Sequence, residues 1–302
     1  MNPEIHSMEN GKITILAPAK INLYFGVTGM RSDGYHEVET VLQSVNLFDR
    51  LTVSASEGNG REVSVLCREL SDVPESENIA YKAAQAYLSA AEEDNIKVEI
   101  TIEKKIPDGA GFGGGSSDAA AAIIALNTLS GDRFSLAELF EIGATVGADV
   151  PFCIKKGTVK ATGFGEVLES CAPMPDCCIV LAVPNGEKVS TAQAYAAMDD
   201  AGYPSEIGAM LSALSECDMK KIASAMKNDF ERVQEDGCAS AQLKEKLLSL
   251  GAVAAMLSGS GAGVFGIFDS VKAAKAAKEV LDDEAKVFVC APARRDYAYV
   301  EK

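Results

Sequence analysis

The stretch of residues 107–127 carries the strongest chemical signal in the sequence. It reads PDGAGFGGGSSDAAAAIIALN, and five of its glycines fall within seven positions, at Gly109, Gly111, Gly113, Gly114 and Gly115. Glycine tolerates positive φ and lets another molecule come close to the backbone, and the alanine-rich run that follows favours a helix. The bare amides at the start of that helix and the positive end of its dipole then face the loop. The stretch therefore predicts an anion site, most often a phosphate site.

A tight turn without a ligand is the alternative, but so many glycines would then destabilise the fold with no compensating contact. Gly109, Gly111 and Gly114 match G-x-G-x-x-G, the fingerprint of dinucleotide oxidoreductases. That class also needs an acidic residue about 20 positions further on, and Asp132 lies that far along with no apolar strand after it. The stretch lacks the lysine of G-x-x-x-x-G-K-[ST], and the chain contains no H-R-D or D-F-G. A Walker A loop and a protein-kinase loop are therefore excluded.

The size and charge of the chain narrow the class of protein. With 302 residues, 47% of them hydrophobic, the chain is long enough for two domains. No run approaches the roughly 18 apolar residues of a membrane span, and MNPEIHSMENG at the start has no apolar core of a secretory signal. We therefore expect a cytoplasmic protein with no membrane partner. The formal net charge of -16 opposes nucleic acid as a partner, including a non-catalytic RNA-binding role, because such proteins neutralise phosphates with lysine and arginine.

Cysteine and histidine offer few alternative sites. The eight cysteines are scattered with no C-x-x-C, which favours reduced core thiols over a disulfide framework or a zinc site. There are two histidines, and His6 lies in an N-terminus that we expect to be loose. Histidine-rich metal sites and most Ser-His-Asp schemes are thus excluded unless His36 carries them.

The glycine-rich stretch is expected to lie between a strand and a helix. Residues 96–106 alternate apolar and charged side chains, as an amphipathic strand does. Ser116, Ser117 or Asp118 can cap the helix that follows. A further helix at 135–146 begins with a serine capping box.

The parts of the chain on either side are less regular. Proline at position 18 predicts two short strands, 12–16 and 21–27, with Lys20 and Asn22 at the irregular start of the second. Two prolines and a cysteine pair at 173–178 indicate a boundary between domains. Beyond it the predicted elements are helices at 191–198, 207–214, 219–227 and 229–250 with a break near Gly237, then strands at 253–257, 264–268 and 286–290 and a helix at 271–281.

Three segments stand out in order along the chain: PAKINLYFGVTGMRSDGYH at 18–36, PDGAGFGGGSSDAA at 107–120 and LSGSGAGVFG at 257–266. Together they resemble the three signatures of the GHMP kinases, which phosphorylate small molecules such as galactose, homoserine and mevalonate. GADVPF at 147–152 and VSTAQAY at 189–195, together with R-x-DGYH, are similar to the branch of that superfamily whose substrate is a cytidine diphosphate alcohol.

The resemblance implies an α+β fold of two domains with the active site in the cleft between them. The N-terminal domain, 11–172, would have the fold of a small-subunit ribosomal protein, and the C-terminal domain, 173–302, would be ferredoxin-like. ATP and Mg²⁺ are the implied co-substrates. The residues that would wrap the triphosphate with backbone amides are Pro107, Asp108, Gly109, Ala110, Gly111, Phe112, Gly113, Gly114, Gly115, Ser116 and Ser117. Ser116, Ser117 and Asp118 all remain candidates for a position next to Mg²⁺.

Asp149 matches the family's catalytic aspartate and Lys20 its catalytic lysine. Phosphoryl transfer passes through a loose transition state, so positioning the alcohol and offsetting spread charge matter more than a strong base. Lys20 would keep Asp149 ionised and offset charge on the transferring group. Asn22 would either bond the alcohol or hold Lys20.

The resemblance also implies a binding site for each nucleobase, the cytosine of the alcohol substrate and the adenine of ATP. Tyr35, His36 and Tyr195 match the positions that form the cytidine pocket, although Tyr195 could instead pack in the core. Asn78 and either Lys104 or Lys105 are candidates for the edge of the adenine site.

A second glycine loop at 258–263 would close the site from the C-terminal domain. The chain departs from the family pattern at Phe112, where leucine is usual, and at Gly263, where a small polar or sulfur side chain is common. Phe112 could change the fit around the nucleotide.

The expected reaction is ATP-dependent phosphorylation of the 2-hydroxyl of a cytidine diphosphate-linked methylerythritol, in non-mevalonate isoprenoid precursor synthesis. The alternative within the superfamily is a kinase of the homoserine or mevalonate type, against which Tyr35, His36 and Tyr195 argue. The sequence makes no prediction about oligomeric state.

Overall fold

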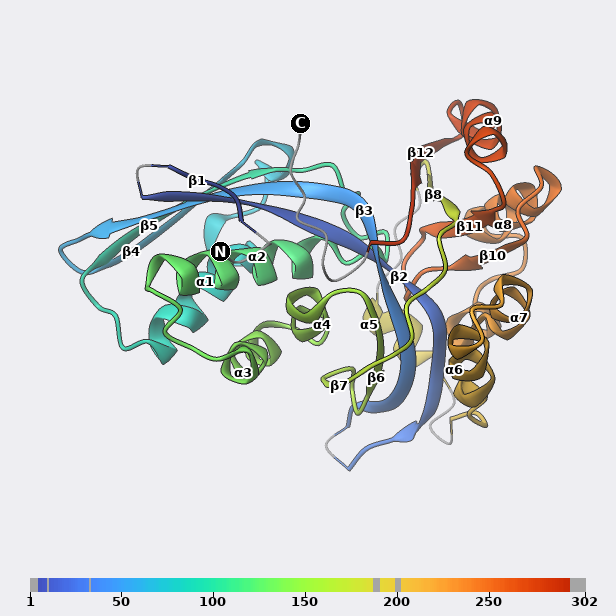
Figure 1. Cartoon of the computed structure of the whole chain (residues 1–302), viewed down its shortest axis with the longest axis horizontal. Coiled ribbons are helices and arrows are strands. Elements are labelled where there is room, and N and C mark those ends of the chain that lie inside the picture. Colours follow the sequence, from blue (N-terminus) through green and yellow to red (C-terminus); the bar gives the residue numbers. More distant parts are fainter. Residues whose placement is uncertain (1–4, 10, 33, 187–190, 199–201, 294–302) are drawn as a thin grey trace.

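A computed structural model describes residues 5–9, 11–32, 34–186, 191–198 and 202–293 (Figure 1). The predicted motif residues Asp33, Val189 and Ser190 lie outside these ranges. The strands are β1 (Ile5–Glu9), β2 (Lys12–Met30), β3 (His36–Glu57), β4 (Arg61–Cys67), β5 (Ile96–Glu103), β6 (Thr158–Thr162), β7 (Val167–Ser170), β8 (Cys178–Pro184), β9 (Lys227–Asn228), β10 (Ala254–Leu257), β11 (Val264–Phe268) and β12 (Ala285–Cys290). The α-helices are α1 (Ile79–Ala90), α2 (Gly114–Leu129), α3 (Leu136–Val146), α4 (Val150–Lys155), α5 (Thr191–Ala196), α6 (Ile207–Ser215), α7 (Met219–Ala225), α8 (Ala239–Ser249) and α9 (Val271–Leu281), and short 3₁₀ turns occur at Arg68–Leu70, Glu75–Glu77 and Asp229–Arg232.

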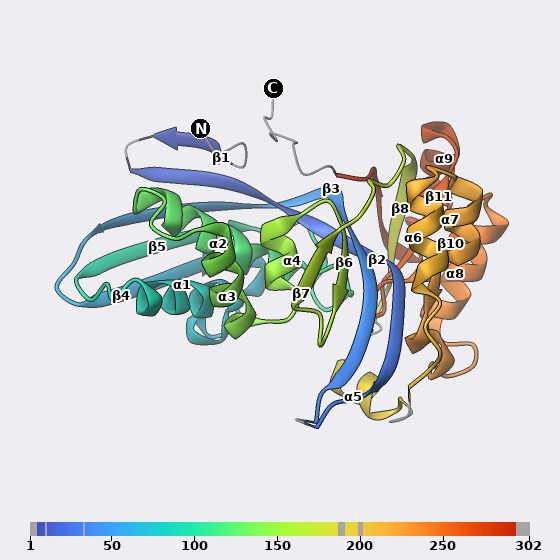
Figure 2. The same cartoon turned by 60° about the horizontal axis from the view of Figure 1, so that its bottom comes forward.

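Two long antiparallel strands, β2 and β3, form the spine of the molecule (Figures 1 and 2). The prediction of two short strands around Pro18 was wrong, because β2 runs without interruption from Lys12 to Met30. The register with β3 shifts between Pro18 and Ala19, whose partners are Phe48 and Val45. This bulge accommodates a residue that cannot donate to the ladder, so the strand continues through it. The prediction of a loose N-terminus also fails at residues 5–9, which pair with β2 as β1.

The first sheet has the strand order β1-β2-β3-β5-β4, with β6 on β3, β7 on β6 and β9 on β2. Helices α1 to α4 lie together along one side of this sheet in both views (Figures 1 and 2). Helix α2 contacts β2 and β3 as well as α1, α3 and α4, so apolar residues surround nearly the whole of it. The small alanine side chains of α2 permit that close approach. Because α2 follows the glycine-rich loop directly, the packed helix anchors the loop to the core.

The second sheet has the order β10-β11-β8-β12 and is covered by α8 and α9. Helix α6 packs against β2 and β3, and β9 pairs in parallel with β2 at Tyr24 and Phe25. The later part of the chain is therefore attached to the spine of the first sheet. The predicted domain boundary at 172–173 falls between β7 of the first sheet and β8 of the second, and it stays a prediction.

Most predicted elements around the site are confirmed, including the capping box, in which Ser135 and Glu138 bond each other's backbone. The predicted helix at 229–250 was wrong in its first part, which is a short 3₁₀ turn at Asp229–Arg232 followed by α8. The Asn228 side chain accepts from the amide of Phe230, and the Asp229 carboxylate accepts from the amide of Val27 in β2. These two bonds form the 3₁₀ turn and hold it next to β2. No helix in the described ranges is long and apolar enough to cross a membrane.

Candidate active site

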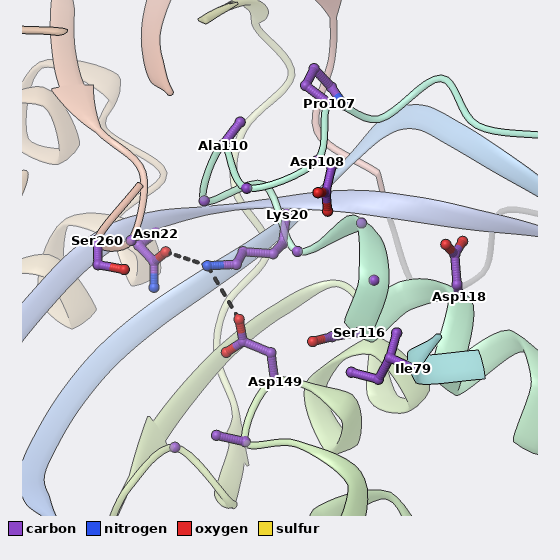
Figure 3. A pocket seen from close by; sticks show the side chains of 18 of the residues that line it. Lys20, Asn22, Ile79, Pro107, Asp108, Ala110, Ser116, Asp118, Asp149 and Ser260 are labelled. Carbon is purple, nitrogen blue, oxygen red and sulfur yellow. Dashed lines mark hydrogen bonds and ion pairs between the residues drawn. The ribbon is translucent and has the colours of Figure 1, made fainter. Parts of the chain in front are cut away.

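A cavity of about 580 Å³ lies where the glycine-rich loop, the start of α4 and the spine strand β2 meet (Figure 3). Its size is typical of a site for a small molecule. One end is lined by Leu70, Val73, Asn78 and Ile79, and the other by an aromatic group. Lys20 and Asp149 lie on the wall between the two ends.

The glycine-rich loop folds as the sequence suggests, but α2 starts earlier than predicted. Its N-cap is Gly113, in a left-handed conformation with φ of 69°, and none of Ser116, Ser117 and Asp118 caps the helix. Only glycine adopts this conformation without strain, so the helix begins directly at Gly114. The loop residues Gly109 and Gly111 also have positive φ. The first amides of α2 therefore lie at the cavity wall, where an anion would bind.

Ser116 and Ser117 point in different directions. The buried Ser117 hydroxyl donates to the carbonyl of Pro18 at 2.8 Å, which ties α2 to β2. The Ser116 hydroxyl faces the cavity on the side of Asp149 (Figure 3). Ser116 is thus the serine that a ligand can reach.

The second glycine loop, residues 258–263, interlocks with the first. Ser258 Oγ donates to the carbonyl of Gly111 at 3.0 Å, and the amide of Gly263 donates to the carbonyl of Ala110 at 3.1 Å. A Cβ on Gly111 would lie 1.9 Å from the Ser258 carbonyl oxygen, so no side chain fits there. The Asn228 side chain in turn donates to the carbonyls of Leu257 and Gly259 and holds the second loop in place.

Lys20, Asn22 and Asp149 meet at the centre of the cavity (Figure 3). Lys20 Nζ lies 3.4 Å from Asp149 Oδ2 and donates to Asn22 Oδ1 at 2.8 Å. Asn22 Nδ2 donates to Thr40 Oγ1, which donates to the carbonyl of Tyr24. This chain of hydrogen bonds fixes the orientation of the Asn22 amide and, through it, the buried Lys20 ammonium.

Asp149 is the accessible member of this group. Its side chain is 37% exposed, against 5% for Lys20, and it stands at the N-cap of α4 without capping that helix. Its carboxylate is therefore free of backbone hydrogen bonds in the described contacts and can accept a proton from a bound alcohol.

The far end of the cavity is aromatic. The ring of Tyr195 stacks on His36 with centroids 5.2 Å apart and meets Phe230 edge-on at 4.9 Å. Phe25 stacks on Phe230 at 4.9 Å and also contacts Tyr195 edge-on at 6.5 Å. Burial, and to a smaller degree the Asp149 carboxylate, raises the pKa of the Tyr195 phenol, so Tyr195 is neutral.

Tyr35 and His36 are not among the residues that line the cavity, but they border it. His36 contacts Tyr195, and its buried Nε2 has no hydrogen-bond partner in the described part of the chain. Tyr35 is 63% exposed and lies 5.9 Å from the ring of Phe164, which does line the cavity. An unpartnered ring nitrogen and an exposed aromatic side chain are what an aromatic base would need.

At the opposite end, Asn78 caps α1 by accepting from the amide of Ala80 at 2.9 Å and also lines the cavity. Lys104 lines it too, whereas Lys105 is not among the lining residues. The place of either lysine at the adenine site stays a prediction.

Sequence reasoning missed several residues of the site. Phe25, Phe230 and Phe164 belong to the aromatic end, and Thr40 supports Asn22. An isolated phenylalanine usually packs in the core, and only Phe164, between two glycines, had a distinguishing context.

Comparison with known proteins gives one consistent answer. The N-terminal GHMP kinase domain model matches residues 78–157, and the C-terminal one matches residues 210–286. A 4-diphosphocytidyl-2-C-methyl-D-erythritol kinase of Synechococcus sp. (strain JA-2-3B'a(2-13)) is 41% identical over 280 residues, 89% of each chain. The enzyme of the same name from Desulfitobacterium hafniense (strain Y51) is 40% identical over 89% of this chain and 91% of its own.

Solved structures agree. A crystal structure of 4-(cytidine 5'-diphospho)-2C-methyl-D-erythritol kinase superimposes with a TM-score of 0.78 and 33% identity, covering 92% of this chain and 98% of that one. A homoserine kinase from Cytophaga hutchinsonii has a TM-score of 0.74 with 19% identity, covering 96% and 98%. The second likeness concerns the fold alone.

Proposed function

The chain belongs to the 4-diphosphocytidyl-2-C-methyl-D-erythritol kinase family of GHMP kinases, and we propose that the cavity around Lys20 and Asp149 is its active site. This membership confirms the predicted two-domain fold and the predicted class of reaction. The protein is an ATP-dependent kinase that phosphorylates 4-diphosphocytidyl-2-C-methyl-D-erythritol in isoprenoid precursor biosynthesis. The acceptor is the 2-hydroxyl of that alcohol in our proposal. The homoserine and mevalonate kinases share only the fold.

The main observation behind the proposal is the position of the Lys20–Asp149 pair. The pair stands between the glycine-rich loop, which offers amides to a triphosphate, and the aromatic end, which offers ring faces to a base. A phosphoryl group held by the loop and an alcohol attached to cytidine would therefore meet at the pair.

In the proposed mechanism, Asp149 orients the alcohol and accepts its proton late in the transfer. Lys20, held by Asn22, lies 3.4 Å from that carboxylate and offsets the charge that spreads over the transferring phosphoryl group. The amides of Gly114 and Gly115 at the start of α2 support the triphosphate from its other side.

The family implies Mg²⁺, and the residues present fit it. The Ser116 hydroxyl and the exposed carboxylate of Asp149 are oxygen donors that face the same space (Figure 3). No group of three or more His, Cys, Asp or Glu able to hold a metal occurs among the described residues. That suits Mg²⁺, which typically takes few protein ligands and binds with substrate phosphates. We assign Ser116 as its protein donor, and the ion would neutralise phosphate charge during transfer.

The cytidine end of the site rests on Tyr195, His36 and Tyr35. We infer that the cytosine ring lies against Tyr195 and Tyr35 and that His36 Nε2, unpartnered among the described contacts, bonds its polar edge. Nucleic acid is not part of the proposal, because the chain carries a formal charge of -16. We expect the enzyme to act in the cytoplasm, which its free cysteines support.

Release of ADP by the purified protein tests the assignment. The assay contains ATP, Mg²⁺ and one of three alcohols: the cytidylylated methylerythritol, homoserine or mevalonate. Turnover is expected with the first alone. Turnover of another alcohol without the first would contradict the substrate but not the kinase class.

Variants then test the site. Asp149→Asn should lower kcat by about 10²- to 10⁴-fold. Asp94→Ala, a change at an exposed aspartate outside the cavity, serves as the control and should leave kcat unchanged. Full activity of Asp149→Asn would contradict the assigned base.

A further inference from the structure

A buried cluster of two carboxylates and one ammonium lies beneath the first turn of α2. It joins three separate elements: Asp49 in β3, Lys104 after the end of β5, and Asp118 in α2. Lys104 Nζ donates to Asp118 Oδ2 at 2.7 Å and to Asp49 Oδ2. The side chains are 0%, 7% and 4% exposed in that order, so water screens none of them.

The cluster is attached to the chain on both sides of the glycine-rich loop. Asp49 Oδ1 accepts from the amides of Lys105 and Ile106, the last residues before Pro107. Asp118 lies directly after Ser117, the last residue of the stretch that would wrap the triphosphate. Lys104 connects the two carboxyl groups, so residues 107–117, which comprise the loop and the first turn of α2, are tied at their start and end to one ammonium.

Gly114 leaves room for this connection. A Cβ at that position would lie 3.2 Å from Lys104 Nζ and 3.0 Å from the Ile106 side chain. The ammonium therefore sits close against the backbone at the start of α2, where the amides face the cavity. Lys104 and Asp118 are themselves cavity residues.

The cluster has more carboxyl groups than ammonium groups. One ammonium faces two carboxylates, and Asp118 Oδ1 is buried with no hydrogen-bond partner in the described part of the chain. Burial and the neighbouring Asp49, opposed by Lys104, raise the pKa of the Asp118 carboxyl. A buried ion cluster of this kind is poor at stabilising a fold compared with apolar packing, which favours a role in positioning.

We propose that Asp49, Lys104 and Asp118 form a clamp that holds both ends of the glycine-rich loop in the geometry that binds ATP. They are positioning residues: they act through the loop backbone, and their loss weakens nucleotide affinity rather than the affinity for the alcohol. The inference rests on the proposed role of this loop as the ATP site.

Binding of the non-hydrolysable analogue AMP-PNP with Mg²⁺ to the full-length protein, measured by calorimetry, tests the clamp. Asp118→Ala removes the acceptor for Lys104 and should raise Kd about tenfold or more, a change well above the error of the method. Asp118→Asn keeps the shape and an acceptor oxygen and should stay within about threefold of the wild type. Asp94→Ala is the matched control and should bind as the wild type does, and the KM for the alcohol should not change in any of the three.

Hydrogen exchange without any ligand gives an independent readout. Asp118→Ala should speed amide exchange in residues 107–117 but not in the sheet strands β8 and β11, and Asp118→Ser repeats the test if the alanine variant does not fold. Wild-type affinity and wild-type exchange in Asp118→Ala, or in Asp118→Ser where that variant replaces it, would overturn the clamp while leaving the proposed function intact. Loss of affinity in Asp118→Asn equal to that in Asp118→Ala would also overturn it, since charge and not position would then be responsible. Absence of AMP-PNP binding by the wild type would instead refute the ATP role of the loop, and the clamp with it.

Discussion

The ring of Phe112 occupies the space next to Gly263 in which a side chain at that position would have to fit. A Cβ built on Gly263 would lie 2.7 Å from Phe112 Cζ and 2.3 Å from the carbonyl oxygen of Ala110. Phe112 is fully buried between the two glycine loops. The two departures from the family pattern, a larger residue at 112 and a smaller one at 263, therefore compensate each other.

A double-mutant cycle should measure this dependence. Gly263→Ala forces the Phe112 ring and the Ala110 carbonyl to move, and overpacking of this kind costs about 1–3 kcal/mol. Phe112→Leu leaves a cavity and costs a similar amount of stability. In the double variant the smaller side chain accepts the new methyl group, so the combined loss should be smaller than the two single losses together by about 0.5–3 kcal/mol.

Denaturant unfolding of the four proteins gives the coupling energy. The double variant should recover only part of the lost stability, because the Ala110 carbonyl is backbone and does not change with residue 112. Strict additivity of the two single losses would show that Phe112 and Gly263 do not depend on each other.

Local sequence rules predicted the glycine loop, the helix after it and the capping box, because each depends on neighbours in the chain. They failed where a distant element decides the outcome. Pro18 does not end a strand because β3 bulges opposite it. Helix α2 begins after the left-handed Gly113 and so precedes the predicted serine caps, and Ser117 bonds the carbonyl of Pro18 in β2 instead.

The residues of the site also differ in how well the sequence predicts them, because distant elements bring them together. Lys20 and Asp149 were assigned from motifs of a family, since nothing in their local sequence brings them together. Asp49 resembles any polar residue within a strand, and only the fold places it against two loop amides and Lys104. The aromatic group of Phe25, Tyr195 and Phe230 likewise comes from three distant segments.

Asn22 should matter for the rate through Lys20. Asn22→Ala removes the acceptor of the Lys20 ammonium and the donor to Thr40, so the ammonium loses its fixed position. We expect kcat to fall by about 10- to 100-fold, as for a misplaced catalytic group, with little change in the KM for ATP. Lys20→Met, which removes the charge itself, should reduce kcat further.

Steady-state kinetics of both variants check this order. A Thr40→Val variant, which keeps the shape of the side chain but cannot bond Asn22, should fall between Asn22→Ala and the wild type. If Asn22→Ala raises only the KM for the alcohol, Asn22 binds the alcohol directly rather than holding Lys20.

Thiol reactivity should separate Cys217 from the buried cysteines. The thiolate is the reactive form, and burial raises the pKa of Cys177 to about 12 and raises the pKa of Cys153 and Cys290 as well. A raised pKa means that these thiols remain protonated from pH 7 to pH 9, and they are also shielded. Cys217 is exposed, so it should give the fast phase with a thiol reagent.

Labelling with Ellman's reagent, with and without denaturant, measures both phases. Cys217→Ser should abolish the fast phase and leave activity unchanged. Rapid labelling of Cys153 or Cys290 in the native protein would contradict the burial of these side chains in α4 and β12.

The aromatic end should decide the affinity for the cytidine substrate. Tyr195→Ala removes a ring that stacks on His36 and contacts Phe230, and stacking of a base on an aromatic side chain is worth about 1–3 kcal/mol. We therefore expect the KM for the cytidylylated alcohol to rise by about 10- to 100-fold. Tyr195→Phe keeps the ring and is the matched control, with a KM near that of the wild type. Because the nucleotide end of the cavity is lined by other residues, including Asn78 and Ile79, the KM for ATP should stay within about twofold in both variants. Equal rises in the two KM values would mean that Tyr195 shapes the whole cavity rather than one end, and the position assigned to the cytosine ring would have to be abandoned.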